Sequence, residues 1–315
     1  MTSVPTHWSR DQGSGAGSLK LHGARRSEPV LHFSGAGGHR CTPPHPAQGG
    51  NVIGTENLTF EVIGQTAVVT MNRPEAKNAL SLPMLVGLVD AWTEIDSNDD
   101  IRCAILTGAG GTFCAGMDLK SMGEPGNEKY AARMADDPDL HWKALLRHYT
   151  LKKPLIAAVE GYAVAGGTEI LQATDIRVAG ESATLGVFEV RRGLFPLGGS
   201  TVRLRRQIPY TIAMELLLTG RPVSAPEAKE IGLIGHVVPD GEALTKAMEI
   251  AEMICANAPL AVEAVKRSVI ETEGMSEIDG LARELELGWP IFATEDAKEG
   301  PRAFAEKRPA NFQRR

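Results

Sequence analysis

The sequence has no long apolar run, few cysteines and no excess of positive charge, and each of these absences excludes a class of function. None of its apolar stretches approaches the roughly 20 residues that a helix needs to cross a bilayer, so we expect no membrane partner. The formal net charge of -6 over 315 residues does not supply the basic surface that nucleic-acid binding requires. At this length the chain can form one large domain or two ordinary ones with a sizeable core. Any anionic partner must therefore be met by local basic groups.

The four cysteines provide neither a disulfide framework nor a metal site. They stand at positions 41, 103, 114 and 255, without a CxxC pair or metal-ligand spacing. This usage suits a reducing compartment, so we expect a cytoplasmic protein with no metal. The stretch GAGGTF, Gly108–Phe113, lacks the third glycine of GxGxxG, and no P-loop lysine follows it. We therefore expect no dinucleotide.

Residues 1–52 differ in composition from the rest of the chain. They mix Gly, Ser, Pro and most of the histidines with no period of 2 or 3.6, which predicts a disordered N-terminal extension. Their arginines and scarcity of acids are also typical of a transit peptide, which would direct the protein to the mitochondrial matrix. Glycine and proline, however, break the amphipathic helix that such a signal needs. A third interpretation is that the native protein starts at Val52.

From Leu58 onward, short β-rich runs alternate with stretches whose apolar residues recur at helical spacing. The predicted strands are 66–72, 102–108, 154–166, 175–180 and 234–239, and the predicted helices are 83–95 and one from about 168. Repeated units of this kind predict an α/β fold around a buried sheet. Helical patterns continue from Ala243 to the end, so we expect a core over 53–240 and a helical region over 241–315.

Two glycine-containing turns follow different predicted strands. In CAGMD and AVAGGTE, glycine leaves backbone N–H groups unobstructed, and two such groups that converge on one oxygen form an oxyanion hole. The second turn stands at a predicted helix start, where the helix dipole favours an anion. Each of these stretches by itself has a simpler interpretation as a tight turn with no chemical role.

Two glutamates extend this pattern. Glu169 falls in the first helical turn after the glycines, a position that acidic residues favour for structural reasons alone. Glu189 is the one acid in the apolar run TLGVFEVRRGLFP. A buried carboxyl there would have the raised pKa that a general acid near neutral pH requires. The alternative is an ion pair with Arg191 or Arg192, and the sequence leaves both interpretations open.

Residues 55–315 resemble the crotonase, or enoyl-CoA hydratase/isomerase, superfamily. The matching stretches are NRPEAKNALS, GTFCAGMDLK, KPLIAAVEGYAVAGGTEILQATDIRVA, PLGGSTVRL, TGRPVSAPEAKEIGLIGHVVP and EGPRAFAEKRPANF. Their order and spacing make the resemblance specific. It implies a crotonase (ClpP-like) spiral of repeated ββα units with a helical C-terminal trimerisation region, assembled as a homotrimer or hexamer.

The resemblance also implies an enoyl-CoA hydratase, which adds water across the 2,3 double bond of a 2-enoyl-CoA thioester. Met117 and Gly166 would supply the two oxyanion N–H groups, and Glu169 and Glu189 would hold the water as base and acid. No metal and no separate cofactor is implied, because CoA is part of the substrate. The enzymatic alternatives within the family are an isomerase, an acyl-CoA hydrolase and a carnitinyl-CoA dehydratase. The alternative from another class is a non-catalytic RNA-binding or structural member.

Further residues are assigned to the substrate by the same resemblance. The family places CoA along the stretches matching RPEAKNAL and GTFCAG, and a neighbouring subunit adds an aromatic residue and a lysine. The candidates are Ala76, Lys77, Asn78, Ala79, Ala115, Asp118, Lys120, Gly167, Trp142, Phe304 and Lys307. Trp142 lies in the segment Met122–Thr150, which usually covers the acyl chain and varies between members. His141 and His148 lie there too, and we expect no catalytic role for them.

Overall fold

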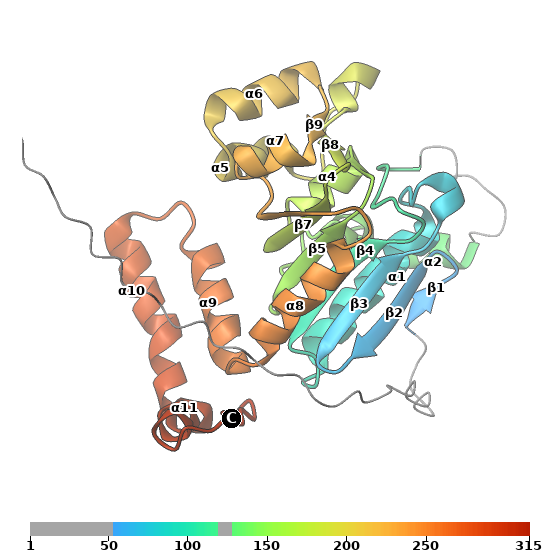
Figure 1. Ribbon diagram of the computed structural model, residues 1–315. Helices are drawn as coiled ribbons and strands as arrows, with labels where there is room; N and C mark the ends of the chain where they lie inside the picture. The colour runs from blue at the N-terminus through green and yellow to red at the C-terminus, as the bar shows by residue number, and fades with distance from the viewer. Residues whose placement is uncertain (1–52, 119–127) are drawn as a thin grey trace, which may run out of the picture. The chain divides into compact units, whose positions relative to one another are not determined.

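A mixed sheet of seven strands forms the centre of the computed structural model, which describes residues 53–118 and 128–315. Its strands lie in the order β1 (Gly54–Thr55), β2 (Leu58–Ile63), β3 (Thr66–Met71), β4 (Cys103–Gly108), β5 (Leu155–Val159), β7 (Ile176–Gly180) and β10 (His236–Val238) (Figure 1). The pairs from β1 to β3 are antiparallel, and the pairs from β3 to β10 are parallel. The predicted extension 1–52 and the predicted substrate ligand Lys120 lie outside the described residues.

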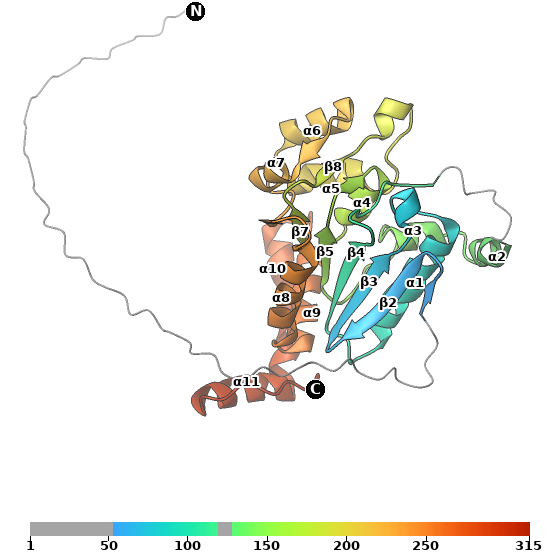
Figure 2. The same ribbon diagram turned by 45° about the vertical axis from the view of Figure 1, so that its right-hand side comes forward.

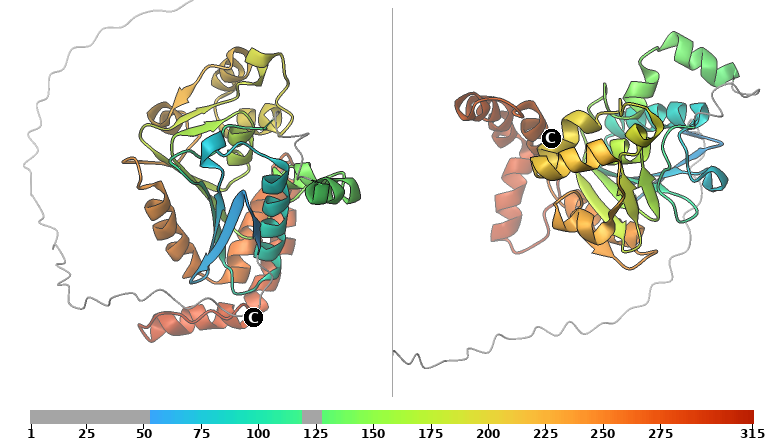
Figure 3. Two further views of the ribbon diagram at one scale, coloured as in Figure 1. Left: turned by 90° about the vertical axis from the view of Figure 1, so that its right-hand side faces the viewer. Right: turned by 90° about the horizontal axis from the view of Figure 1, so that it is seen from above.

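The side chains of the parallel strands alternate between two helical layers. On β4, Ala104 and Leu106 pack in one apolar cluster with α1 (Leu82–Ser97). Cys103 and Ile105 pack in a second cluster with α8 (Ala243–Cys255). Helices α1 and α8 therefore cover opposite faces of the sheet, as the left view of Figure 3 shows. A sheet covered on both faces needs apolar residues at successive positions, which explains the continuous apolar runs of β4 and β5.

A second sheet in the described residues contains three short strands, and it gives the chain its repeating unit. These strands are β6 (Tyr162–Val164), β8 (Thr184–Gly186) and β9 (Val223–Ser224). The chain passes from β5 through β6 into α4 (Gly166–Leu171), and from β7 through β8 toward α5 (Ser200–Gln207). This ββα repetition confirms the predicted α/β fold. Helices α6 (Tyr210–Thr219) and α7 (Ala225–Glu230) pack against α5 and β9, respectively (Figure 1).

Most predicted elements agree with the structure to within two residues at their ends. The predicted strand 154–166 is different, because it is divided into β5 and β6. The chain turns between them at Gly161, which has φ 55°, and a Cβ atom there would lie 2.3 Å from the Gly111 oxygen. Only glycine fits this turn, and the sequence pattern alone did not separate it from the apolar runs on either side.

The C-terminal helices carry an apolar surface. After α8 come α9 (Pro259–Glu271), α10 (Glu277–Gly288), the 3-10 turn η4 (Trp289–Ala293) and α11 (Glu295–Ala305). Helices α9 and α10 pack side by side, and α11 lies at the opposite end from α4 in Figures 1 and 2. The exposed large apolar side chains include Val265, Val269, Ile278, Leu281, Leu285, Trp289, Phe292 and Phe304. Each of these side chains is at least 57% exposed.

Two further helices lie against α1, and none of the described helices is suited to a bilayer. Helices α2 (Glu128–Asp136) and α3 (Leu140–Ala144) both contact α1. Within the described residues, no helix is both long enough and apolar enough to cross a membrane.

Candidate active site

The turn after β4 presents the Met117 N–H group on one side of the backbone. In a parallel bridge, the Leu80 N–H donates to the Gly116 oxygen over 2.8 Å, and the Asp118 N–H donates to the Leu80 oxygen over 3.1 Å. Leu80 therefore bonds to the Gly116 oxygen and the Asp118 N–H, on either side of Met117, and makes no backbone hydrogen bond to Met117 itself. The Met117 N–H points away from Leu80 as a result.

The first residue of α4 lies against this turn. A Cβ atom built on Gly166 would lie 3.5 Å from the Met117 nitrogen, and one built on Gly116 would lie 3.2 Å from the Gly166 nitrogen. Among the hydrogen bonds of residues 53–118 and 128–315, none is donated by the Met117 or the Gly166 N–H. The structure thus brings together the two N–H groups predicted as oxyanion donors, and the absence of side chains on Gly116 and Gly166 allows this close approach.

The start of α4 depends on an unusual backbone conformation at Ala165. This residue has φ 51° and ψ -126°, a combination that residues with a side chain rarely adopt. Its N–H donates to the Gly186 oxygen, and its own oxygen accepts from the N–H groups of Thr168 and Glu169. The surrounding structure therefore holds a conformation that is costly by itself, as is common at functional sites.

Cys114 and Gly167 are explained by packing. The Cys114 side chain is fully buried, and burial raises the pKa of its thiol to about 12, so it is not a nucleophile near neutral pH. A Cβ atom on Gly167 would lie 2.3 Å from the Cys114 oxygen. Only glycine therefore allows α4 to approach the turn, which accounts for Gly167 without any contact to a substrate.

Glu169 extends from the first turn of α4 toward the chain that leads into α5. Its side chain is buried, and its Oε1 accepts from the Ser200 N–H over 3.2 Å. A Cβ atom on Gly198 would lie only 2.5 Å from the Glu169 Oε2 atom. Burial raises the pKa of Glu169, while hydrogen bonds from Ser200 and Gly198 and the charge of Arg203 oppose this effect. The carboxyl is therefore held in a buried, hydrogen-bonded position.

Glu189 is a second, half-buried carboxyl and begins the 3-10 turn η3 (Glu189–Arg192). Burial, and to a smaller extent the charge of Glu169, raises the pKa of Glu189 to about 7. Its Oε2 atom is buried and has no hydrogen-bond partner within the described residues. The Arg191 guanidinium lies over the Phe188 ring at 5.4 Å. Within the described part of the chain, Glu189 forms no ion pair with either neighbouring arginine, so the structure favours an unpaired carboxyl with one buried oxygen over the ion pair.

Asn78, a predicted CoA ligand, uses its side chain to shape its own loop. The loop follows the 3-10 turn η1 (Pro74–Ala76), and Asn78 has φ 54°. Its fully buried amide accepts from the Arg73 N–H over 2.8 Å and donates to the oxygens of Ala109 and Thr112. Asn78 therefore fixes the loop against the turn after β4.

The neighbouring candidates are also bonded within the protein. The Ala79 N–H donates to the Ala76 oxygen over 3.1 Å, and the Ala115 N–H donates to the Lys77 oxygen over 3.0 Å. The Lys77 side chain is exposed, with its ammonium 4.9 Å from the centre of the Tyr162 ring. Lys77 is thus the member of this set that presents a positive charge to solvent, where a phosphate group has access.

The remaining candidates lie in three different places. Phe304 is 87% exposed on α11, and Lys307 follows that helix, far from α4 (Figures 1 and 2). Trp142 on α3 stacks with the Arg147 guanidinium at 4.6 Å. Asp118 is paired with Arg73 beside the Met117 turn. The single chain therefore brings the oxyanion donors and the glutamates together but leaves the C-terminal candidates elsewhere.

The cradle of Glu169 is the part of the site that the sequence analysis missed. Gly198, Ser200 and Arg203 all surround Glu169, although PLGGSTVRL was recognised only as a family match. The available signal was the pair of adjacent glycines directly before a helix. Such a pair often marks a place where other atoms approach the backbone closely.

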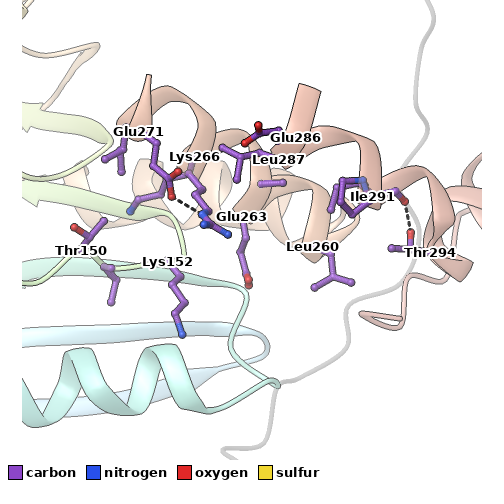
Figure 4. Close-up of a pocket in the computed structure, with 15 residues that line it drawn as sticks. Thr150, Lys152, Leu260, Glu263, Lys266, Glu271, Glu286, Leu287, Ile291 and Thr294 are labelled. Carbon is purple, nitrogen blue, oxygen red and sulfur yellow. Dashed lines mark hydrogen bonds and ion pairs between the residues drawn. The ribbon is translucent and has the colours of Figure 1, made fainter. Parts of the chain in front are cut away.

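A separate cavity of about 680 Å³ lies between α9, α10 and the chain before β5 (Figure 4). Leu260, Ile270 and Ile291 form part of its apolar lining. Neither Glu169 nor Glu189 belongs to it, so this cavity is not part of the candidate active site.

Comparison with known sequences identifies relatives of the whole folded region. The sequence model of the enoyl-CoA hydratase/isomerase family matches residues 62–315. The chain is 59% identical over 258 residues to enoyl-CoA hydratase EchA19 of Mycobacterium tuberculosis, covering 80% of this chain and 94% of that protein. It is 38% identical over 256 residues to (E)-benzylidenesuccinyl-CoA hydratase of Thauera aromatica, covering 81% of this chain and 98% of that protein.

Solved structures give the same result. A crystal structure of an enoyl-CoA hydratase from Mycobacterium tuberculosis H37Rv superposes with a TM-score of 0.74 at 41% identity, over 82% of this chain and 99% of that one. An enoyl-CoA hydratase from Bacillus anthracis superposes with a TM-score of 0.76 at 36% identity, over 82% of this chain and all of that one (100%). These likenesses confirm the predicted crotonase fold.

Proposed function

The chain belongs to the enoyl-CoA hydratase/isomerase family and has its hydratase function, and from this premise we propose how its residues hydrate a 2-enoyl-CoA thioester. One observation carries the proposal: the buried Glu169 carboxyl lies one helical turn beyond the Gly166 N–H, and its charge raises the pKa of a second, half-buried carboxyl, Glu189. Two carboxyls held in different environments are a common basis for a paired acid and base.

In the proposed reaction, the backbone first polarises the substrate. The thioester oxygen accepts hydrogen bonds from the Met117 and Gly166 N–H groups, which donate no hydrogen bond elsewhere in the described residues. Polarisation makes C3 of the enoyl group electrophilic and lets the oxygen take up enolate charge when C3 is attacked. Removing one donor of this kind typically costs about 10²- to 10³-fold in rate.

The two carboxyls then transfer the protons. Glu169 takes a proton from water as the water oxygen bonds to C3, and Glu189 gives its proton to C2 as the enolate collapses. The product is the 3-hydroxyacyl-CoA, and the site resets when the proton on Glu169 is returned to Glu189 through solvent. Each positioned acid or base contributes about 10²- to 10⁴-fold. The pKa of Glu189 near 7 suits an acid that is protonated at neutral pH.

This reaction needs no metal and no redox cofactor. Water adds without any change in the oxidation state of the active-site groups, and the backbone N–H groups supply the electrophilic assistance that a metal ion would otherwise give. We propose that CoA binds along the Lys77–Ala79 loop, with the exposed Lys77 ammonium near its phosphates.

The protein is proposed to assemble as a homotrimer or a pair of trimers. Many large exposed apolar side chains on successive C-terminal helices, such as Ile278, Leu285 and Phe292, are unusual on a monomer, and a second copy would bury them. Phe304 and Lys307 would then stand near a neighbouring subunit's substrate. Sedimentation of the wild type and of Ile278→Lys tests this, with a lower mass expected for the variant.

A cytoplasmic location is proposed on the chemistry of the thiols. Cys103, Cys114 and Cys255 are free. Free cysteines of this kind suit a reducing compartment.

The decisive experiment follows loss of enoyl-thioester absorbance over a panel of 2-enoyl-CoAs. The panel runs from crotonyl-CoA to long-chain, steroid side-chain and aryl-substituted thioesters, the last because the Thauera aromatica relative is named for such a substrate. Glu169→Gln and Glu189→Gln are compared with Glu249→Gln, which changes an exposed carboxyl on α8 paired with Lys246.

We expect the wild type and Glu249→Gln to hydrate at least one thioester and both site variants to lose most of the rate while still binding CoA. Isomerase activity that survives loss of Glu169 would favour an isomerase instead. Thioester hydrolysis would favour a hydrolase, and saturable RNA binding at physiological salt without turnover would favour the non-catalytic alternative.

A further inference from the structure

Arg203 joins three segments of the chain around Glu169. Its Nη1 atom donates to the Gly198 oxygen over 3.2 Å and lies 3.5 Å from the Glu169 backbone oxygen. Its Nη2 atom donates to the Leu146 oxygen. One guanidinium therefore contacts α4, the turn before α5 and the chain after α3. A planar group with several N–H donors can make these contacts at once, whereas an ammonium cannot.

The turn before α5 is shaped to accommodate two side chains. A Cβ atom on Gly198 would lie 2.5 Å from the Glu169 Oε2, and one on Gly199 would lie 3.1 Å from the Arg203 Nη1. Gly199 also has φ 124°, where a side chain would be strained. The two adjacent glycines thus make room for the carboxyl on one side and for the guanidinium on the other.

The chain after α3 is attached to the same turn from its own side. The Arg147 Nη1 atom donates to the Leu197 oxygen over 2.7 Å, while the neighbouring Leu146 oxygen accepts from Arg203. These reciprocal bonds cross-link the two segments. A shift of the Arg203 guanidinium would therefore break its bonds to the Gly198 and Leu146 oxygens and leave the Arg147 bond to the Leu197 oxygen in place.

We propose that Arg203 is a positioning residue for the proposed hydration, fixing the Gly198–Ser200 turn that holds the Glu169 carboxyl. The inference rests on the proposed function for its effect on rate. Arg203 acts through the turn, because its hydrogen bonds go to backbone oxygens. A misplacement of a reacting group by about 1 Å can cost about 10²-fold in rate, so a positioning defect is measurable.

Arg203 also acts on Glu169 by charge, which provides a separate readout. The charged groups that influence Glu169 are Arg203 from α5 and Glu189 from η3. The cation lowers the pKa of the Glu169 carboxyl, so its removal must raise that pKa. Replacement by lysine keeps the charge and loses the fork of hydrogen bonds.

The test uses the full chain with Arg203→Lys, Arg203→Met and the control Arg206→Met. Arg206 lies on the same helix, and its guanidinium pairs with Glu273 at 3.1 Å. Turnover is measured with crotonyl-CoA, or with another panel thioester if the wild type prefers one. The Glu169 carboxyl is titrated by NMR in carboxyl-labelled protein, which requires no turnover.

For Arg203→Lys we expect kcat to fall by about 10- to 10²-fold with KM little changed and the titration of Glu169 close to that of the wild type. For Arg203→Met we expect a similar loss of rate. We also expect Glu169 to titrate at higher pH than in the wild type, and the acid limb of kcat/KM to move to higher pH with it. Arg206→Met should behave as the wild type.

An unchanged kcat in Arg203→Lys would overturn the inference, and this variant decides the matter if Arg203→Met does not fold. The inference would also be overturned by an Arg206→Met variant with the same defects as the Arg203 variants. An Arg203→Met variant that melts at a lower temperature but keeps the wild-type rate and the wild-type titration of Glu169 would overturn it as well. If the wild type hydrates no thioester, the proposed function fails; the inference then fails separately if Arg203→Met leaves the Glu169 titration unmoved.

Discussion

The negative charge of Glu169 helps to hold the pKa of the Glu189 carboxyl near 7, although the two residues are 20 positions apart in the chain. Burial is the larger cause, and within the described residues no basic side chain pairs with Glu189 to oppose it. The two carboxyls therefore titrate as an interacting pair, with Glu169 on α4 and Glu189 on η3.

The first prediction concerns this coupling. Glu169→Gln removes the charge that raises the Glu189 pKa, so the titration of Glu189 should move to lower pH. Carboxyl-labelled NMR of the variant measures the shift directly, with Glu249→Gln as the control carboxyl change. In the wild type, kcat/KM should fall as the pH rises through about 7, because Glu189 must carry the proton that it donates. A Glu189 titration that is the same with and without Glu169 would contradict the coupling.

The second prediction is a stability change with pH. The folded-state pKa of Glu189 is about 7, above its unfolded value, so the folded protein binds the proton more tightly. The stabilisation that proton binding at Glu189 adds to the free energy of unfolding is fully present below the unfolded pKa. It is lost as the pH rises through about 7. Glu189→Gln should therefore be more stable than the wild type at pH 8 by about 1–2 kcal/mol, after discounting for solvent screening, and equal to it at pH 4. Urea unfolding at the two pH values checks this, and a difference that does not depend on pH would refute it.

The third prediction tests the cradle of Glu169. Gly198→Ala places a methyl group 2.5 Å from the present position of the Glu169 Oε2, so the carboxyl or the turn must move. We expect kcat to fall by about 10²-fold, because the base is displaced. Gly235→Ala is the matched control, since its nearest neighbour would be the Arg177 oxygen at 3.8 Å. Steady-state kinetics of both variants decide the point, and equal activities would show that the cradle does not set the rate.

The fourth prediction tests the oxyanion donors. Gly166→Ala places a methyl group 3.5 Å from the Met117 nitrogen, in the space that the thioester oxygen would need. We expect kcat/KM to fall by about 10²- to 10³-fold, comparable to the loss of one donor. Gly288→Ala serves as the control, because its Cβ atom meets nothing within 4 Å. Wild-type kinetics in Gly166→Ala would place the carbonyl elsewhere.

Local patterns in the sequence determined the order and type of most elements. Strand β3 and helix α1 were predicted nearly to their ends, since a β-rich run and an apolar period of 3.6 are properties of neighbouring residues. The oxyanion turns and both glutamates were also found in the sequence, because each belongs to a short motif. The division of 154–166 into β5 and β6 was missed, because the close approach at Gly161 involves Gly111, 50 residues earlier.

Tertiary structure alone decided which polar groups are paired. The sequence offered Glu189 two arginines as partners, but the fold turns Arg191 onto Phe188 and leaves the half-buried Glu189 carboxyl where the charge of Glu169 raises its pKa. The fold also places the Asn78 side-chain amide in hydrogen bonds with three backbone groups. It brings the Arg203 guanidinium next to the Glu169 backbone oxygen. Periodicity and motifs are carried by residues that are close in the chain, so a sequence determines them. Charge, burial and pairing depend on atoms brought together from distant segments, so only the folded chain determines those.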